Sequence, residues 1–481
     1  MAYEAARWQT LRLLRGRLHR SVEAFLHRNQ VQLDHFRFID RVWVRQTLLQ
    51  DPELQADAAE QARARGTTLL TVRALIEEWL DEIVPYFNIL SYYKLGGAVA
   101  QTITKACYEL VFDEAGLERA RAQVPRGAVT VYVANHRSNA DYVVLSVGAM
   151  RQVALSYAVG EWARVWPLDV LFRSFGSYFV RRGEKDPLYH HVLERYLQLV
   201  ASRGLTTAFF LEGGLSRDGE LREPKIGLLD YLIGMLRTEP EREIVFIPVG
   251  INYDRVFEDH NLLADARPTA GSKLRSFSKL VVQVPGLLLG LFARAAIRAH
   301  RRYGYAAVSF GPAIPLRDFL PDATVVAALP DRLRRPRIAA AADHLLACVH
   351  AAIPATPVVL TAAALLAGAR DHASLVRAVR EELAVLAGTG RPVARGVAFR
   401  RSLPTLQSAD VQKGLLDEAI GDSEEAEQMV ELGLMLLERR GLIQNVRGAV
   451  RVDAQADELL RYYANSMQAP THLAFRPAPA G

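Results

Sequence analysis

The sequence has few cysteines, no long apolar run and little net charge. Its two cysteines, Cys107 and Cys348, are too few for a disulfide framework and cannot form a zinc site by themselves. No segment reaches the ~18 consecutive apolar residues that a membrane-spanning helix needs. The 59 basic residues exceed the 53 acidic ones by only six, which gives little support to a nucleic-acid partner. We expect a protein of a reducing compartment that binds no nucleic acid.

The composition indicates a folded chain of more than one domain. Half of the residues are hydrophobic and 23% are charged, which excludes intrinsic disorder, and 481 residues exceed one compact core. The pattern is helical at both ends and mixed in the middle. We predict an N-terminal helical region over residues 1–86, an α/β domain over 87–320 and a C-terminal helical domain over 321–481.

Short β-rich runs alternate with helical runs in the middle region. The expected strands are residues 129–134, 153–159, 177–181, 206–211, 244–249 and 306–310. Helical patterns lie between them, such as residues 188–202, which stop before Gly204. Residues 69–84 form an amphipathic helical run before the middle region. The alternation predicts an α/β fold with a central, mostly parallel sheet flanked by helices.

Two segments have features of a membrane surface. Residues 280–293 are almost entirely apolar but too short to cross a bilayer, and no acidic residue occurs from Ala266 to Leu316. Arginines and lysines lie on both sides of this run, which suits insertion beside anionic headgroups. Residues 1–30 form a basic, helix-periodic stretch. The alternative for each segment is a helix packed on its own domain.

A candidate general base follows the first expected strand. Ser138 and Asp141 have the spacing of a capping box, which predicts a helix that begins at about Asn139. His136 then lies at the carboxyl end of a strand, where open α/β sheets place their ligands. A carboxylate in the first helical turn can hold the imidazole and stabilise its charged form. The alternative is that Asp141 only caps the helix and His136 is a loop histidine.

A glycine-rich loop follows the strand at residues 206–211. Residues 212–219 contain three glycines, and Arg217 and Lys225 lie in or just after this loop. Backbone N–H groups and these two cations can converge on a phosphate. Such turns are common after strands, so the loop alone is weak evidence.

Two further features lie at strand ends. Arg181 and Arg182 close the strand at 177–181, and alternation turns them to opposite faces, so one of them is expected to face the site. A solvated arginine is the alternative for each. Pro248 is expected to mark the end of the strand at 244–249, because proline cannot donate to a sheet.

Taken together, these motifs resemble the sequence blocks of the glycerolipid acyltransferases. The blocks occur in the family's order and spacing, as Asn135-His136-Arg137-Ser138 with Asp141, Gly176 with Arg181-Arg182, Phe210-Leu211-Glu212-Gly213 with Ser216-Arg217, and Ile247-Pro248. More narrowly, the chain is similar to the bacterial membrane-associated glycerol-3-phosphate acyltransferases over residues 58–472. Details outside the blocks support this likeness, among them Arg461-Tyr462-Tyr463-Ala464-Asn465.

The resemblance implies a reaction and a role for each block. His136 would take the proton of the acceptor hydroxyl while Asp141 holds the ring, with no metal, no cofactor and no acyl-enzyme. The donor would be acyl-CoA or acyl-carrier protein, and the acceptor the sn-1 hydroxyl of glycerol 3-phosphate. The residues that would bind the substrates are Arg137, Arg181, Arg182, Glu212, Gly213, Ser216, Arg217, Lys225 and Pro248. The family also implies a peripheral position on the cytoplasmic side of the inner membrane, at an anionic surface.

One residue departs from the family's pattern. Leu215 lies where the family usually has an arginine, and losing a cation that faces phosphate would cost about 1.5–3 kcal/mol. Either Arg217 and Lys225 bind the phosphate, or the acceptor is lysophosphatidate or dihydroxyacetone phosphate. A lipid-binding protein that has lost activity is a further alternative, against which the His136 and Asp141 pair argues.

A metal hydrolase is the least supported alternative. His190 and His191 are neighbours on an expected helix, where adjacent side chains diverge. His344 and Cys348 share a helical face but provide only two ligands, whereas zinc needs three or four. We therefore expect no metal site.

Overall fold

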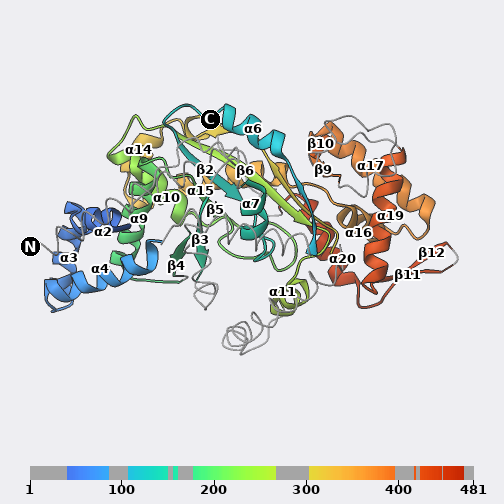
Figure 1. Cartoon of the computed structure of the whole chain (residues 1–481), viewed down its shortest axis with the longest axis horizontal. Coiled ribbons are helices and arrows are strands. Elements are labelled where there is room, and N and C mark those ends of the chain that lie inside the picture. The colour runs from blue at the N-terminus through green and yellow to red at the C-terminus, as the bar shows by residue number, and fades with distance from the viewer. Residues whose placement is uncertain are drawn as a thin grey trace, which may run out of the picture.

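The computed structural model describes most of the middle and C-terminal parts of the chain (Figure 1). The described residues are 41–85, 107–149, 155–160, 177–181, 183–266, 303–395, 416–418, 423–446 and 448–470. The group of helices that comes first in the sequence lies at one end of the long axis, and the helices of the C-terminal region lie at the other.

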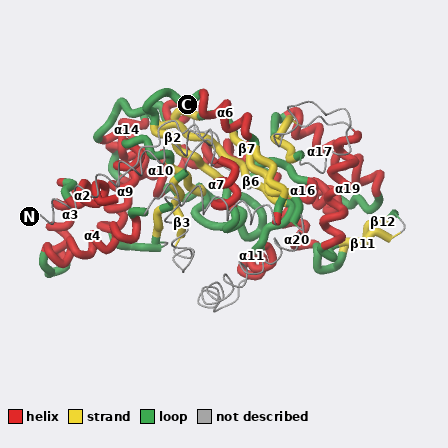
Figure 2. The backbone as a smooth tube through the Cα atoms, viewed as in Figure 1, coloured by secondary structure: helices red, strands yellow, loops and turns green. Residues whose placement is uncertain are grey.

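A central sheet joins the two helical groups, as Figure 2 shows. Its strands are β1 (Glu109–Phe112), β2 (Val129–Ala134), β3 (Ser156–Gly160), β4 (Tyr178–Val180), β5 (Thr207–Phe210), β6 (Ile244–Tyr253), β7 (Tyr305–Phe310) and β8 (Ile314–Pro315). The spatial order is β1-β7-β6-β2-β5-β3-β4, with β8 paired to β6. The neighbours of β2, β3 and β4 are parallel, whereas β7 and β8 run antiparallel to β6. The prediction of a mostly parallel sheet is confirmed.

Helices cover both faces of this sheet. The helices between its strands are α6 (Glu114–Ala122), α7 (Asp141–Ala149), α9 (Pro187–Ser202), α10 (Gly227–Gly234), the 3-10 turn η3 (Met235–Arg237) and α11 (Asp259–Ala266). After β8 come α13 (Leu316–Phe319), α14 (Ala323–Ala328) and the long α15 (Asp331–Ala352).

The two faces of the sheet have separate cores because successive side chains alternate along each strand. One face of β2 presents Val131 and Val133 to a cluster that includes Leu229 of α10 and Leu345 of α15. The other face presents Tyr132 to a cluster with α6, α7 and the C-terminal helices. The strands β2 and β6 are thus buried on both sides, which explains their near-continuous apolar sequences.

The N-terminal helices form a third core with α9. They are α2 (Arg41–Leu49), α3 (Pro52–Ala64) and α4 (Leu69–Ile83). Val72, Ile76 and Trp79 of α4 pack in one cluster with Tyr189 of α9. The Trp79 and Tyr189 rings meet edge to face at 5.6 Å. The amphipathic helix predicted at residues 69–84 is confirmed.

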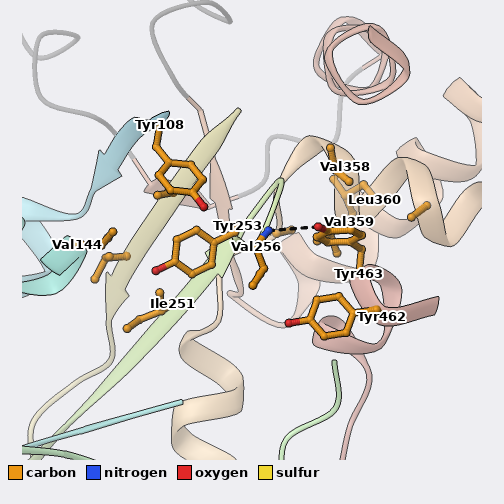
Figure 3. Packing of buried hydrophobic residues seen from close by; sticks show 14 of the residues in the cluster. Tyr108, Val144, Ile251, Tyr253, Val256, Val358, Val359, Leu360, Tyr462 and Tyr463 are labelled. Atoms are coloured by element: carbon orange, nitrogen blue, oxygen red, sulfur yellow. Dashed lines mark hydrogen bonds between the residues drawn. The ribbon is translucent and has the colours of Figure 1, made fainter. Parts of the chain in front are cut away.

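The C-terminal region packs against the end of the sheet. Its elements are α16 (Pro357–Leu366), α17 (His372–Gly388), β9 (Pro392–Ala394), β10 (Leu416–Glu418), α19 (Ser423–Arg439), β11 (Ile443–Val446), β12 (Ala449–Val452), α20 (Asp457–Ala464) and the 3-10 turn η6 (Asn465–Met467). Figure 3 shows Tyr253 of β6 and Tyr463 of α20 in the same apolar cluster. The sheet and the C-terminal helices therefore share one core.

Some of the predicted element bounds agree with the structure, and others do not. The strand at 129–134 has the predicted bounds, and α9 ends at Ser202 before Gly204 as expected. Strand β1 was not predicted. The prediction that Pro248 ends its strand is wrong, because β6 continues to Tyr253. On one side of β6, Pro248 lies between the residues paired to β8 and those paired to β7, so its missing N–H interrupts no ladder there.

The membrane-related predictions lie outside the described residues. These are the basic stretch at 1–30 and the apolar run at 280–293 with the arginines that follow it. Among the residues that the structure describes, none of the helices has both the length and the apolar character that crossing a membrane requires. The domain boundaries at 86 and 320 stay predictions.

Candidate active site

The structure brings His136 and Asp141 together at the carboxyl end of β2. His136 Nδ1 lies 2.9 Å from Asp141 Oδ2, and both side chains are almost completely buried. The contact assigns Nδ1–H to the carboxylate and leaves Nε2 as the basic nitrogen of a neutral ring. This is the pairing that the sequence predicts for a general base.

Asp141 accepts more hydrogen bonds than the one from His136. Its Oδ2 also accepts the backbone N–H groups of Arg137 at 2.8 Å and Ser138 at 3.1 Å. The capping box is only half formed, because Ser138 Oγ accepts from Ala140 rather than from Asp141. Helix α7 consequently begins at Asp141 and not at about Asn139, which corrects the predicted start.

Tyr253 is a site residue that the sequence reasoning missed. Its hydroxyl donates to Asp141 Oδ1 at 2.6 Å from the last residue of β6. Burial, followed by the nearby negative charge of Asp141, raises the pKa of Tyr253 far above its ordinary value, so it stays a donor. The motif gave no signal for this contact, since the two residues are 112 positions apart.

Aromatic packing and backbone pairing fix the turn that carries His136. The imidazole stacks on the Phe210 ring at 4.0 Å, nearly parallel to it, and meets Tyr142 edge-on at 5.5 Å. Asn135 Nδ2 donates to Ile251 O, and its Oδ1 accepts from Ile251 N. The Asn135 side chain therefore pairs with the backbone of β6 through both a donor and an acceptor, as a residue of a neighbouring strand does.

Two carboxylates, of the buried Glu212 and the half-buried Glu258, hold the same turn from other parts of the chain. Glu212 Oε1 accepts the His136 N–H at 2.7 Å, and its Oε2 accepts the Arg222 N–H at 2.8 Å. Burial raises the pKa of Glu212 to about 8 despite these two bonds. Glu258 accepts from Ser138 Oγ at 2.7 Å and from Asn139 N at 3.2 Å, and burial raises its pKa as well.

The glycine-rich loop at residues 212–219 folds against the His136 turn. The Ser216 N–H donates to His136 O at 3.0 Å, and Ser216 Oγ donates to Glu220 O while accepting from Gly219 N. Gly213 has a φ of +62°, and a β-carbon there would lie 2.7 Å from Lys225 Cγ. Gly213 thus permits both the turn and the approach of the lysine stem.

A cavity of about 240 Å³ opens beside His136. Its wall is mostly apolar, and the residues that line it are His136, Tyr142, Ala158, Val159, Gly160, Val180, His190, Leu193, Phe209, Phe210, Gly213, Lys225, Gly227, Leu228 and Tyr231. One base, one cation and an apolar wall therefore meet in one space. That combination suits an acceptor that has both a hydroxyl and an anionic group, together with an apolar chain.

His190 and Tyr231 are two further polar side chains among the lining residues. Tyr231 Oη lies 2.9 Å from His190 Nδ1, and His190 Nε2 lies 2.9 Å from Glu184 O. A carbonyl only accepts, so Nε2 carries the proton in this arrangement and Nδ1 accepts from the tyrosine. The ring of His190 is therefore held between protein groups.

The predicted cationic residues are distributed unevenly around the cavity. Lys225 is exposed and lines it, and Arg217 is exposed on the glycine-rich loop. Arg181 instead donates through both Nε and Nη2 to the carboxylate of Glu82 in α4, and this ion pair raises the pKa of Arg181. Arg182 lies outside the described residues.

Arg137 and Pro248 do not line the cavity. The Arg137 guanidinium is buried and donates to Gly219 O at 2.7 Å, with its Cζ 4.8 Å from the centre of the Tyr462 ring. Pro248 pairs with Val133 of β2, whose side chain belongs to the cluster on the α10 and α15 face. Leu215 is half-buried against the other core cluster. The roles predicted for these residues toward substrates stay predictions.

One group of side chains in the described part of the chain has the spacing of metal ligands. It consists of His372, Glu427 and Glu431, all exposed on α17 and α19. None of the three lines the cavity beside His136. His344 and Cys348 contact each other at 3.7 Å, as their shared helical face predicts.

Two family models match the chain. The model described as Acyltransferase matches residues 118–252, which include the His136 turn, the glycine-rich loop and nearly all of β6. The model described as Glycerol-3-phosphate acyltransferase C-terminal region matches residues 288–478. The first match contains His136 and Asp141, so this part of the chain is similar to known acyltransferases.

Two curated relatives share one name. Glycerol-3-phosphate acyltransferase of Aeromonas hydrophila is 31% identical over 279 residues, which cover 57% of this chain and 32% of the relative. The enzyme of the same name from Glaesserella parasuis is 27% identical over 444 residues, which cover 89% of this chain and 50% of the relative. The chain is similar to these glycerol-3-phosphate acyltransferases over much of its length and spans half or less of the length of these relatives.

A solved structure also aligns with the chain. It is the 1-acyl-sn-glycerophosphate acyltransferase of Thermotoga maritima, with 15% identity and a TM-score of 0.29. The alignment covers 53% of this chain and 82% of that one. A score this low adds nothing to the assignment.

Proposed function

We propose that the protein transfers a fatty acyl chain from acyl-CoA or acyl-carrier protein to the sn-1 hydroxyl of glycerol 3-phosphate, the first step of phospholipid synthesis. The observation that carries this proposal is the buried His136 and Asp141 pair, 2.9 Å apart, beside a cavity that Lys225 also lines. The name that the curated relatives share supports the choice of acceptor.

The proposed chemistry needs one proton shuttle. His136 Nε2 takes the proton of the acceptor hydroxyl as its oxygen attacks the thioester carbonyl, and Asp141 stabilises the imidazolium that forms. When the tetrahedral intermediate collapses, the carbon–sulfur bond breaks and the imidazolium returns the proton to the leaving thiolate. Atoms and charge balance without a metal, a cofactor or a covalent enzyme intermediate.

The substrates have complementary surroundings in this proposal. Lys225 and Arg217 are the described cations that we assign to the acceptor phosphate, because Lys225 lines the cavity and Arg217 is exposed on the adjoining loop. The apolar wall formed by residues such as Val159, Leu193 and Leu228 suits the start of the acyl chain.

An acceptor panel tests the proposal. The protein is given one labelled acyl thioester with glycerol 3-phosphate, dihydroxyacetone phosphate or lysophosphatidate, and the lipid product is identified. We expect 1-acylglycerol 3-phosphate as the main product. Turnover of lysophosphatidate alone would replace the proposed acceptor, and no acyl transfer to any of the three would reject the enzyme assignment.

Leu215→Arg sharpens the choice of acceptor. It restores a cation at the position where the family usually has one, so the KM for glycerol 3-phosphate should fall by about threefold to tenfold if that is the acceptor. Leu215→Met is the matched control because it keeps an apolar side chain of similar volume. An unchanged KM for glycerol 3-phosphate in the arginine variant, with good turnover of lysophosphatidate, would favour the second acceptor.

We also propose peripheral binding to an anionic membrane, on the basis of the basic residues around the apolar run at 280–293. Replacing Arg298, Arg301 and Arg302 with glutamate should reduce cosedimentation with vesicles that contain anionic lipid. Equal binding of the variant and the parent protein to such vesicles would contradict this part of the proposal.

A further inference from the structure

The C-terminal helix α20 contacts the glycine-rich loop at residues 212–219. Arg137, next to His136 in the chain, donates through Nη1 to Gly219 O at 2.7 Å and through Nη2 to Tyr462 O at 3.4 Å. Its guanidinium also lies over the Tyr462 ring. One buried cation therefore joins the base, the glycine-rich loop and α20.

The loop and the helix also interlock directly. Gly219 has a φ of +92°, and a β-carbon at this position would lie 1.9 Å from Tyr462 O. Asn465 Nδ2, one residue past α20, donates to Asp218 O at 3.0 Å. The last residues of the loop thus follow the surface of α20 closely, and only glycine fits at position 219.

Helix α20 is itself fixed to the end of the sheet. The Tyr463 hydroxyl bonds to Asp259 at the start of α11 and accepts from Val256 N at 3.2 Å, a bond that Figure 3 shows. Arg440, one residue past α19, pairs with the same Asp259. Ser466 Oγ accepts from Asn252 Nδ2 of β6 at 3.2 Å. The part of α20 that contacts the glycine-rich loop is therefore held in place by contacts that do not involve the loop.

We propose that the segment Tyr462–Asn465 positions the glycine-rich loop and so sets the affinity of the site for its phosphate-bearing acceptor. The inference rests on the proposed function only for the identity of that acceptor. Gly213, at the other end of the loop, lines the cavity and contacts the Lys225 stem, so a displaced loop moves the cation as well as the backbone donors. Tyr462 and Asn465 are positioning residues, since neither of them lines the cavity.

Hydrogen exchange tests the positioning without any assay of activity. The variants are Asn465→Ala, which removes the bond to Asp218 O, and Tyr462→Leu, which removes the ring beneath Arg137. We expect the amides of Ser216 and Gly219, which are both hydrogen-bonded, to exchange about tenfold faster in either variant. The amides of β5 should keep their rates.

Two matched variants serve as controls. Arg461→Ala changes the neighbouring residue on α20, whose exposed side chain pairs with Asp457 of the same helix, and it should leave the loop unchanged. Tyr462→Phe keeps the ring over Arg137 and should also exchange at the parent rate. If Tyr462→Leu does not fold, Asn465→Ala still decides, because it deletes a single hydrogen bond at the protein surface.

Steady-state kinetics provides the second measurement. In Asn465→Ala and Tyr462→Leu we expect the KM for glycerol 3-phosphate to rise about tenfold, with kcat and the KM for the acyl thioester within about threefold of the parent values. Loop exchange and acceptor KM equal to those of Arg461→Ala would overturn the inference. If the parent protein does not acylate glycerol 3-phosphate, the proposed function fails, and hydrogen exchange still decides whether α20 positions the loop.

Discussion

The two sides of the cavity differ in how firmly their polar groups are held. On the base side, His136, Asp141 and Tyr253 are all buried and joined by hydrogen bonds that start from three different elements. On the cationic side, Lys225 and Arg217 are exposed side chains on or beside a glycine-rich loop. A base needs fixed geometry to abstract a proton, whereas cations can adjust to a phosphate on their long stems.

The difference explains why so much polar structure is buried around one histidine. Asp141 alone accepts four hydrogen bonds, from the His136 ring, two backbone N–H groups and the Tyr253 hydroxyl. Each of these donors would lose a partner if the carboxylate moved, so the ring position is over-determined. We expect substitutions on the base side to lower kcat and those on the cationic side to raise KM.

Asp141→Asn should have the largest effect on this comparison. The amide removes the charge that stabilises the imidazolium, and in one of its two orientations it places an N–H₂ group against the N–H of the His136 ring, so kcat should fall about a thousandfold. Asp113→Asn is the matched control, because Asp113 caps α6 through Gly116 N and asparagine caps equally well. Near-parental kcat in Asp141→Asn would remove the carboxylate from the proposed mechanism.

Lys225→Met should act on binding and not on chemistry. Loss of a charge-assisted contact costs about 1.5–3 kcal/mol, which corresponds to a rise of roughly tenfold to a hundredfold in the KM for the phosphate acceptor. Lys185→Met, at an exposed lysine that does not line the cavity, is the control. A variant with unchanged acceptor KM and reduced kcat would contradict the division between the two sides.

Tyr253→Phe should have a smaller effect on the base side. Without the hydroxyl, Asp141 keeps more of its charge for the imidazolium, so the acid limb of the pH–rate profile should move to higher pH. The carboxylate also loses a bond that holds it in position, so kcat should fall about tenfold. Tyr108→Phe is the control, since its ring packs against Tyr253 at 5.3 Å but its hydroxyl donates to Arg255 O. A fall in kcat with an unmoved pH profile would indicate a purely structural role for Tyr253.

Glu212→Gln should have the smallest effect, and this effect is on the free energy of unfolding. Burial raises the pKa of Glu212 to about 8, so between about 4.5 and 8 the folded protein holds a proton that the unfolded chain has released. The free energy of unfolding should therefore decrease as pH rises through this window and level off above it. When denaturation is measured at pH 6 and at pH 9, the free energy of unfolding of the parent should fall between the two by about 1–2 kcal/mol more than that of Glu212→Gln. An equal loss in both proteins would contradict the raised pKa.

The sequence predicts the local parts of this structure better than the long-range parts. The strand at 129–134 and the pairing of His136 with Asp141 depend on neighbours within a few positions, and both agree with the structure. The start of α7 was misplaced because the Ser138 hydroxyl accepts from Ala140 N and not from Asp141 N, a choice that the spacing of the motif does not reveal. Tyr253 could not be found, because nothing in the motif marks a partner that only the sheet brings near.

Buried and exposed charges of the same type also look alike in a sequence. Arg137 and Glu212 belong to the family's blocks and were expected to bind substrate, yet both side chains form hydrogen bonds to backbone groups of the protein itself. Lys225 was predicted to bind substrate in the same way as Arg137, and its side chain does line the cavity. The difference between a cation that ties loops together and one that faces a ligand depends on burial, which appears only in the folded chain.

The most direct test is acyl transfer to glycerol 3-phosphate by His136→Ala beside the parent protein, with thermal unfolding recorded for both. We expect the parent to form labelled 1-acylglycerol 3-phosphate and the variant to form none above the uncatalysed rate, while its unfolding stays cooperative. Product formation by the folded variant at a rate near that of the parent would contradict the assignment of His136 as the base.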